Sequence, residues 1–240
     1  METADYLEIL HKGGITMRGQ FMYGSNYTFF VDVEFGAEKL KAVYKPLRGE
    51  QLLWDFPAKS LAGREVAVWM VSQALGWHFV PPTVLRRSKA PLGAGSLQLF
   101  IEHDPEQHYF TFDDETKQSL RPVVLFDLVV NNADRKGGHL LIDPPGKLWA
   151  IDHGLCFHVE DKLRTVIWDF AGDPIPQELL SDLVRFKAQL QEDETLRHDL
   201  LDYLKQGELD AITKRIGVLE ENSTFPQPSR DRRAFPWPPV

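Results

Sequence analysis

The sequence has few cysteines, few basic residues and no long apolar run, and each shortage excludes a class of protein. Cys156 is its only cysteine, so no internal disulfide can form and a reducing compartment is expected. The 27 Lys and Arg against 35 Asp and Glu give a net charge of −8. Because no long basic run is present either, we expect no nucleic acid partner and no polybasic membrane anchor.

No apolar stretch approaches the roughly 20 residues that cross a bilayer, and the acidic N-terminal "METADYLEIL" does not resemble a signal peptide. We therefore expect a cytoplasmic protein without integral membrane association. Several active-site motifs are missing as well: the G-x-x-x-x-G-K-[ST] loop, the G-x-G-x-x-G fingerprint and the G-x-S-x-G elbow. A zinc site of His153, Cys156 and His158 would lack paired-cysteine spacing. Cys156 is better explained as a small buried residue.

What is present in the first half is a series of strands with one helix. A Tyr-Gly-Ser-Asn turn divides "GQFMYGSNYTFFVDVEF" into a hairpin, and "KLKAVYKPL" follows as a third strand. "SLAGREVAVWMVSQALG" predicts a buried helix with Ser60 as N-cap and Gly76 as its stop. "FVPPTVLRR" and "GSLQLFIEHD" predict two further strands.

The second half is predicted to be mainly helical. An acidic connector over 102–115 leads to a helix over 120–131, and Pro144-Pro145-Gly146 joins two short strands. Leucines at helical spacing beyond Pro174 predict three more helices, the last over 208–219. The Pro- and Arg-rich end, "PQPSRDRRAFPWPPV", is expected to be extended or disordered, although Phe235 and Trp237 can dock.

Lys45 and Glu65 are the first candidate site residues. Lys45 ends a predicted strand, and a buried lysine needs an anion as a partner. Glu65, on the following helix, can supply one carboxylate, and phosphate oxygens can supply further contacts. The alternative is an exposed lysine before a proline turn. Nearby, Gly24, Ser25 and Asn26 form a small-residue turn whose backbone N–H groups can approach phosphate, although an ordinary hairpin uses the same residues.

Asp134, His139 and Asp152 form the most specific group. Asp134 follows a predicted helix, whereas His139 and Asp152 lie at the outer ends of two strands that form a hairpin. The three side chains can therefore converge, as an oxygen-rich site that holds a divalent cation against nucleotide phosphates requires. In the alternative, Asp134 pairs with Arg135 and Asp152 caps a turn.

These segments, in this order, resemble the phosphatidylinositol 3/4-kinase-like branch of the protein-kinase superfold, and type II phosphatidylinositol 4-kinases in particular. "GSNYTFFVDV" resembles the family's phosphate loop, "KAVYKP" its lysine strand, and "GSLQLFIE" its hinge between lobes. "VLFDLVVNNADRKGGHLLID" resembles the catalytic loop and "LWAIDHGLCF" the metal-binding aspartate motif. An uncharacterised bacterial subfamily would account for the short chain.

The resemblance implies an α+β, two-lobed fold. Its N-lobe, a small antiparallel sheet with one helix, would span 1–101 and its mainly helical C-lobe 102–220, with a tail over 221–240. It also implies site roles. Lys45 would bind the α- and β-phosphates and pair with Glu65, and Asp152 would hold the metal. Asp134 would orient the acceptor hydroxyl and accept its proton. Phosphate cover would come from Gly24, Ser25 and Asn26, and adenine recognition from the backbone of Gln98, Leu99, Phe100 and Ile101.

One position departs from the family pattern. Where the family has an asparagine as a second metal ligand, this sequence has His139, and imidazole suits Mn²⁺ better than Mg²⁺. The cofactors implied are ATP with Mg²⁺ or Mn²⁺, with Mn²⁺ favoured. The chain lacks the cysteine-rich palmitoylation segment of type II lipid kinases, so a protein, the chain itself or a small molecule is as good an acceptor as a lipid.

We therefore predict a phosphotransferase that moves the γ-phosphate of ATP to a hydroxyl. Two alternatives remain at this stage. One is an inactive nucleotide-binding module whose tail or acidic connector meets a protein partner. The other is a kinase-like enzyme that transfers adenylate.

Overall fold

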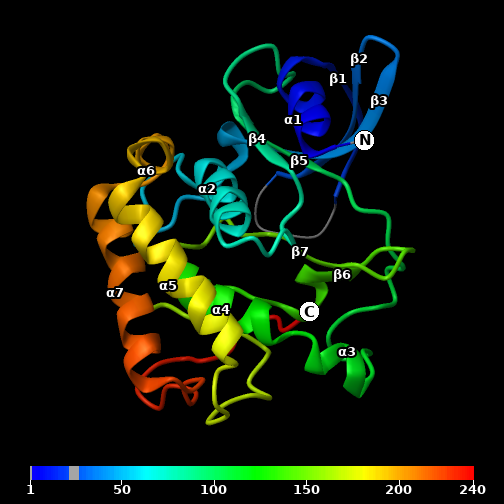
Figure 1. Ribbon diagram of the computed structural model, residues 1–240. Coiled ribbons are helices and arrows are strands. Elements are labelled where there is room, and N and C mark those ends of the chain that lie inside the picture. Colours follow the sequence, from blue (N-terminus) through cyan, green and yellow to red (C-terminus); the bar gives the residue numbers. More distant parts are fainter. Residues whose placement is uncertain (1, 22–26) are drawn as a thin grey trace.

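A computed structural model describes residues 2–21 and 27–240, and they form an α+β, two-lobed, kinase-like architecture, as predicted (Figure 1). The smaller lobe is a five-stranded antiparallel sheet with the strand order β1-β2-β3-β5-β4. Its strands are β1 (Gly14–Gln20), β2 (Phe29–Phe35), β3 (Glu38–Pro46), β4 (Thr83–Arg86) and β5 (Gly95–Leu99).

The predicted hairpin is confirmed by the pairing of β1 with β2, which extends to Gln20 opposite Phe29. The turn that we placed at Gly24, Ser25 and Asn26 lies outside the described residues. Beta-branched residues explain the sheet, because Val31 and Val33 of β2 are fully buried.

Helix α1 (Thr3–Lys12) precedes the sheet and was not predicted. It buries only Ile9 and Leu10, too few positions for a helical period to stand out from the sequence. The guanidinium of Arg86 holds the end of this helix, since it donates to the carbonyls of Leu10 and Gly13, both at 2.9 Å.

Helix α2 (Leu61–Ala74) is the predicted buried helix, and Gly76 follows it with a left-handed φ of +78°. The free backbone N–H groups at its N-terminus are not bonded to the residue that we predicted. Ser60 makes no capping hydrogen bond, and the Glu50 carboxylate accepts from the N–H groups of Leu61 and Ala62 at 3.3 and 2.9 Å. Glu50 lies in the segment after η1 (Leu47–Gly49), so this segment is tied to the start of α2.

The larger lobe is mainly helical. Its elements are α3 (Asp114–Gln118), α4 (Arg121–Val130), η2 (Gly137–His139), β6 (Leu140–Ile142), β7 (Leu148–Ala150), α5 (Gln177–Glu192), α6 (Glu194–Leu201) and α7 (Gln206–Asn222). Short α3 was not predicted, and its first two residues, Asp114 and Glu115, are the last acidic residues of the connector over 102–115. No helix in the described part of the chain is both long and apolar enough to cross a membrane.

Two hydrophobic cores divide the molecule, and α2 joins the larger one. Ala67, Val68 and Val71 of α2 pack with α4, α5 and α7, whereas α1 and the sheet share a separate core. A buried ion pair between Arg64 of α2 and Glu208 of α7 reinforces this attachment. The lobe limits of 1–101, 102–220 and 221–240 remain our proposal, with α2 held by both lobes.

The C-terminal tail is extended, as predicted, and it docks on the larger lobe. Ala234 is 7% exposed, and the ring of Phe235 lies 6.4 Å from that of Trp168. Trp237 remains 75% exposed. The tail ends beside the segment that precedes β6, where Pro239 O accepts a hydrogen bond from Gly137 N (Figure 1).

Candidate active site

A cavity of about 360 Å³ lies where the two lobes meet. Strands β3 and β5 and helix α2 line it from one side, and the segment before β6 and the segment after β7 line it from the other. All the described site residues that we predicted contribute to its wall, namely Lys45, Glu65, Gln98, Leu99, Phe100, Ile101, Asp134, His139 and Asp152. Residues 107 positions apart in the chain therefore open onto one cavity.

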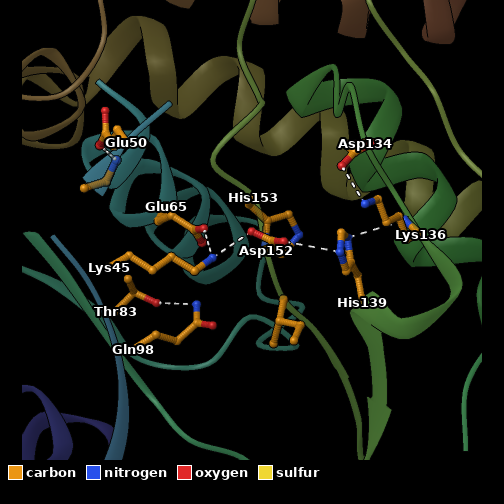
Figure 2. A network of polar contacts seen from close by, with 12 residues as sticks. Lys45, Glu50, Glu65, Thr83, Gln98, Asp134, Lys136, His139, Asp152 and His153 are labelled. Atoms are coloured by element: carbon orange, nitrogen blue, oxygen red, sulfur yellow. Dashed lines mark hydrogen bonds and ion pairs between the residues drawn. The ribbon is translucent and has the colours of Figure 1, made fainter. Parts of the chain in front are cut away.

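Lys45 bridges the two lobes. It lies near the end of β3, and its Nζ is 2.6 Å from Glu65 Oε1 and 2.7 Å from Asp152 Oδ1 (Figure 2). Only 22% of the Lys45 side chain is exposed. The alternative of an exposed lysine before a proline turn is therefore wrong.

The electrostatics of this trio favour the charged forms. Burial disfavours the Lys45 ammonium, but Asp152 and then Glu65 outweigh burial and raise the pKa of Lys45. Burial also acts against the Asp152 carboxylate, yet Lys45 and His139 lower its pKa. Asp152 has a left-handed φ of +59°, a conformation that an aspartate adopts more readily than most residues and that is common at functional sites.

Asp134 lies across the cavity from Lys45, in the loop that follows α4. Its backbone N–H donates to Asn132 Oδ1 at 3.0 Å, and its Oδ2 lies 3.6 Å from Lys136 Nζ (Figure 2). Burial raises the pKa of Asp134 to about 6, with Lys136 opposing the shift. A carboxylate with such a pKa is well matched to accept a proton near neutral pH.

The neighbouring Arg135 points into the protein interior. It is 0% exposed, and it forms two hydrogen bonds to the Asp127 carboxylate of α4, both 2.8 Å long. Its Nη2 also lies 2.6 Å from His153 Nε2. The alternative that Asp134 pairs with Arg135 is therefore wrong, because Lys136 takes that place.

His139 lies on the far side of Asp152 from Lys45, with 3.3 Å between its Nε2 and Asp152 Oδ2 (Figure 2). Burial lowers the pKa of His139 to about 4, so the ring is neutral at pH 7. The backbone N–H of Lys136 points at Nδ1 over 3.4 Å. This contact assigns the ring proton to Nε2, which then donates to Asp152.

The donor set fits a cation shared with phosphates. Among the residues that the structure describes, no group of three or more His, Cys, Asp or Glu side chains could hold a metal alone. Asp152 offers carboxylate oxygens on the cavity wall, and the adjacent His139 Nε2 can bind an ion only after its proton moves to Nδ1. A divalent ion bound by one or two side chains takes its other ligands from phosphate and water.

The four hinge residues are not equivalent. The Leu99 N–H donates to Pro82 O at 2.9 Å and the Phe100 N–H to Lys41 O at 3.0 Å, so both are used inside the sheet. The Gln98 side chain donates to Thr83 Oγ1 at 2.8 Å (Figure 2). For Ile101 N–H no such bond is found within 2–21 and 27–240, which distinguishes it from the N–H groups of Leu99 and Phe100.

Three contributors to the site escaped prediction. Lys136 pairs with Asp134, and Arg135 attaches the loop to α4 through Asp127. Glu50 lines the cavity and caps α2. The signal for Lys136 was its place two residues after Asp134, at the edge of the glycine pair. Glu50 carried no comparable signal, because its partners are backbone groups of a helix eleven residues away.

The overall arrangement is that of protein-kinase-like proteins. Over 91% of this chain and 74% of the other, it superposes on a crystal structure of the Golgi casein kinase with Mn/ADP bound, with a TM-score of 0.59 at 15% identity. The structure of hydra Fam20 with sugar gives a TM-score of 0.56 at 14% identity, over 91% of this chain and 87% of that one. The Helicobacter pylori proinflammatory kinase CtkA gives 0.53 at 11% identity, over 90% and 94%.

Sequence similarity then places the chain in a family. The profile for phosphatidylinositol 3- and 4-kinase matches residues 66–206, more than half of the chain. Protein Rv2133c of Mycobacterium tuberculosis (strain ATCC 25618 / H37Rv) is 36% identical over 265 aligned residues, which cover 96% of this chain and 94% of that protein. The chain belongs to the phosphatidylinositol 3- and 4-kinase family, as its motifs predicted, and it has a bacterial relative.

Proposed function

We propose that this protein is an ATP- and divalent-metal-dependent phosphotransferase that transfers the γ-phosphate to a hydroxyl. The observation that carries the proposal is the position of Lys45, which contacts Glu65 and Asp152 from opposite lobes on a cavity that Asp134 also lines. Family and fold support a kinase-type enzyme.

Lys45 is the phosphate-binding cation of this proposal. Its ammonium is held at the cavity by Glu65, which is itself almost fully buried. Lys45 can therefore meet the α- and β-phosphates without a search through rotamers. The turn at Gly24, Ser25 and Asn26 would cover the phosphates, and Ile101 at the hinge would meet the adenine.

Asp152, with His139 beside it, would hold the cation. A divalent ion held there would supply positive charge to offset the negative charge that develops on the phosphates during transfer. Nucleotide with a divalent ion is supported by the Golgi casein kinase, whose structure contains Mn/ADP. We retain Mn²⁺ as the favoured ion over Mg²⁺, on the softness of the imidazole.

Asp134 would orient the acceptor hydroxyl and take its proton. Its carboxylate lines the cavity, and its pKa of about 6 leaves it ionised at pH 7 yet able to accept a proton. Lys136, 3.6 Å away, would offset the negative charge of the transferred group. We leave the acceptor as a hydroxyl of a protein, of the chain itself, of a small molecule or of a lipid.

The test is incubation of the full chain with γ-labelled ATP and Mn²⁺, followed by detection of label on the protein or on added hydroxyl compounds. Wild type is expected to transfer label, and Asp134→Ala to lose about 100-fold or more of the rate. A parallel reaction with α-labelled ATP must give no incorporation. Incorporation of label from α-labelled ATP but not from γ-labelled ATP would show that the enzyme transfers adenylate and not the γ-phosphate.

One observation favours a second function, that of an inactive nucleotide-binding module. His139 stands at the asparagine position and contacts Asp152 directly, which occupies one carboxylate oxygen. In this second proposal, a protein partner meets the exposed Trp237 of the tail or the acidic connector. Nucleotide that raises the melting temperature without any label transfer would favour the module.

A further inference from the structure

The segment 232–239, which we name the C-terminal strap, is bonded to the loop that follows the Asp152 motif. Arg232 donates to the carbonyl of Leu163 and forms an ion pair with Asp161. Two residues later, Ala234 O accepts hydrogen bonds from Thr165 N at 3.1 Å and from Trp168 Nε1 at 3.3 Å. The strap is thus fixed by side chains and backbone together.

The same loop is bonded to the catalytic loop on its other side. Arg135 N donates to Arg164 O at 2.9 Å, and Val166 N donates to Arg135 O at 3.1 Å. Arg135 and Thr165 form a parallel bridge through these bonds. A continuous path of hydrogen bonds therefore runs from Ala234 through Thr165 to the residue next to Asp134.

The strap also reaches the catalytic loop directly, at Gly137. Gly137 N donates to Pro239 O at 2.8 Å, and Gly137 O accepts from Tyr109 N at 3.2 Å. Both backbone groups of Gly137 are therefore bonded to segments outside the loop. A Cβ at Gly137 would lie 2.9 Å from the ring of Phe110, so the glycine is needed for this close approach.

Asp134 and His139 lie on either side of these two attachment points. The strap therefore constrains the loop at Arg135 and at Gly137, between the two side chains that face the cavity. It contributes no side chain to the cavity wall that could touch nucleotide. It also lies beyond residue 206, where the family match ends.

We propose that the C-terminal strap is a positioning element of the phosphotransfer site, which holds Asp134 at its working distance through Thr165 and Gly137. This inference rests on the proposed function. A displacement of about 1 Å at a catalytic group can cost on the order of 100-fold in rate. Loosening of the strap would therefore lower kcat, whereas nucleotide binding through Lys45 and Asp152 would persist.

The test uses three substitutions in the full chain. Arg232→Ala removes the bonds to Leu163 O and Asp161, and Ala234→Glu forces a charged side chain into a buried position. Arg233→Ala is the matched control, because Arg233 is an exposed neighbour with the same charge and, within 2–21 and 27–240, makes no side-chain hydrogen bond or ion pair. Each variant is compared with wild type for hydrogen exchange of the peptide over 134–139, for kcat, and for the KM of ATP.

Arg232→Ala and Ala234→Glu are expected to speed exchange over 134–139 by at least about tenfold. They are also expected to lower kcat by at least about tenfold and to leave the KM of ATP within about twofold. Arg233→Ala is expected to match wild type. If the Ala234→Glu variant does not fold, the comparison of Arg232→Ala with Arg233→Ala alone tests the strap proposal.

The strap proposal is overturned if the Arg232→Ala variant has the same amide exchange rate over 134–139 and the same kcat as the Arg233→Ala control. It is also overturned if the KM of ATP rises in step with the fall in kcat, because nucleotide binding would then be disturbed as well. Each kcat is referred to the concentration of folded protein, since a loss of folded protein lowers apparent kcat and leaves KM unchanged. If wild type transfers no label, the proposed function fails. Amide exchange over 134–139 then still decides whether the strap fixes the catalytic loop.

Discussion

Arg135, in the loop that carries Asp134 at the cavity, forms a buried ion pair with two hydrogen bonds to Asp127 of α4. Their side chains are 0% and 1% exposed, and each of the two hydrogen bonds is 2.8 Å long. Asp127 also accepts from Asn132 Nδ2 at 3.0 Å. The two adjacent residues therefore have different roles: Asp134 faces the cavity, and Arg135 anchors the loop to α4.

The first prediction concerns this anchor. Asp127→Ala should lower the free energy of unfolding by about 3–5 kcal/mol, because it leaves the Arg135 guanidinium buried without its partner. Chemical denaturation measures this, with the exposed Arg230→Ala as a control expected to change stability by less than about 0.5 kcal/mol. A loss below about 1 kcal/mol for Asp127→Ala would show that the pair does not hold the loop.

The second prediction concerns nucleotide affinity. Lys45→Met should weaken ATP binding by about 10- to 100-fold, since charge-assisted hydrogen bonds contribute about 1.5–3 kcal/mol. Lys41→Met is the matched control on the same strand, where the lysine is 54% exposed and pairs with Glu102. Calorimetric titration with ATP and Mn²⁺ provides the measurement. Equal affinities for the two variants would remove Lys45 from the phosphate site.

The third prediction is a pH dependence of turnover. Asp134 must be ionised to accept a proton, and its pKa is raised to about 6. Below pH 6 the rate should therefore fall about tenfold per pH unit, and above pH 7 it should be flat. A profile of kcat/KM from pH 4.5 to 8.5 measures this. A rate that stays constant down to pH 5 would contradict the assigned role.

The same group gives a stability prediction with a definite sign. The folded-state pKa of Asp134 lies above its ordinary value, so the folded state pays for the charge when the pH exceeds about 6. Asp134→Asn should therefore be more stable than wild type at pH 8, by roughly 1–3 kcal/mol. The gain should disappear below pH 4, where both side chains are neutral. Thermal unfolding at the two pH values tests this, and an equal gain at both would contradict it.

The fifth prediction concerns the metal. His139 Nε2 carries the proton that it donates to Asp152, so ligation through this atom requires the proton to move to Nδ1, which faces the Lys136 N–H. His139→Asn should therefore strengthen ATP binding with Mg²⁺ more than with Mn²⁺, by about tenfold in the ratio. ATP titrations with each ion measure the ratio. A wild type that already prefers Mg²⁺ clearly would refute the Mn²⁺ prediction.

The sequence was most informative where one residue type had to meet a strict chemical need. Lys45, Glu65, Asp134 and Asp152 interrupt apolar segments, and such charged residues need partners when buried. Their order along the chain also matched known motifs. The strands and the long helices followed from their hydrophobic periods in the same way.

Contacts made by backbone groups could not be predicted. Glu50 caps α2, and Pro239 O accepts from Gly137, but neither contact depends on a distinctive side-chain pattern. The partner of Arg135 was missed for a related reason. A sequence shows that Arg135 follows Asp134, but only the turn of the chain after α4 shows that the two side chains point in opposite directions.

The most direct test of the central claim is a crystal structure of the full chain with ADP and Mn²⁺. The phosphates are expected between Lys45 and Asp152, with the ion on the Asp152 carboxylate and the adenine beside Ile101. Nucleotide bound elsewhere, or an ion that does not contact Asp152, would contradict the assignment of this cavity as a phosphotransfer site.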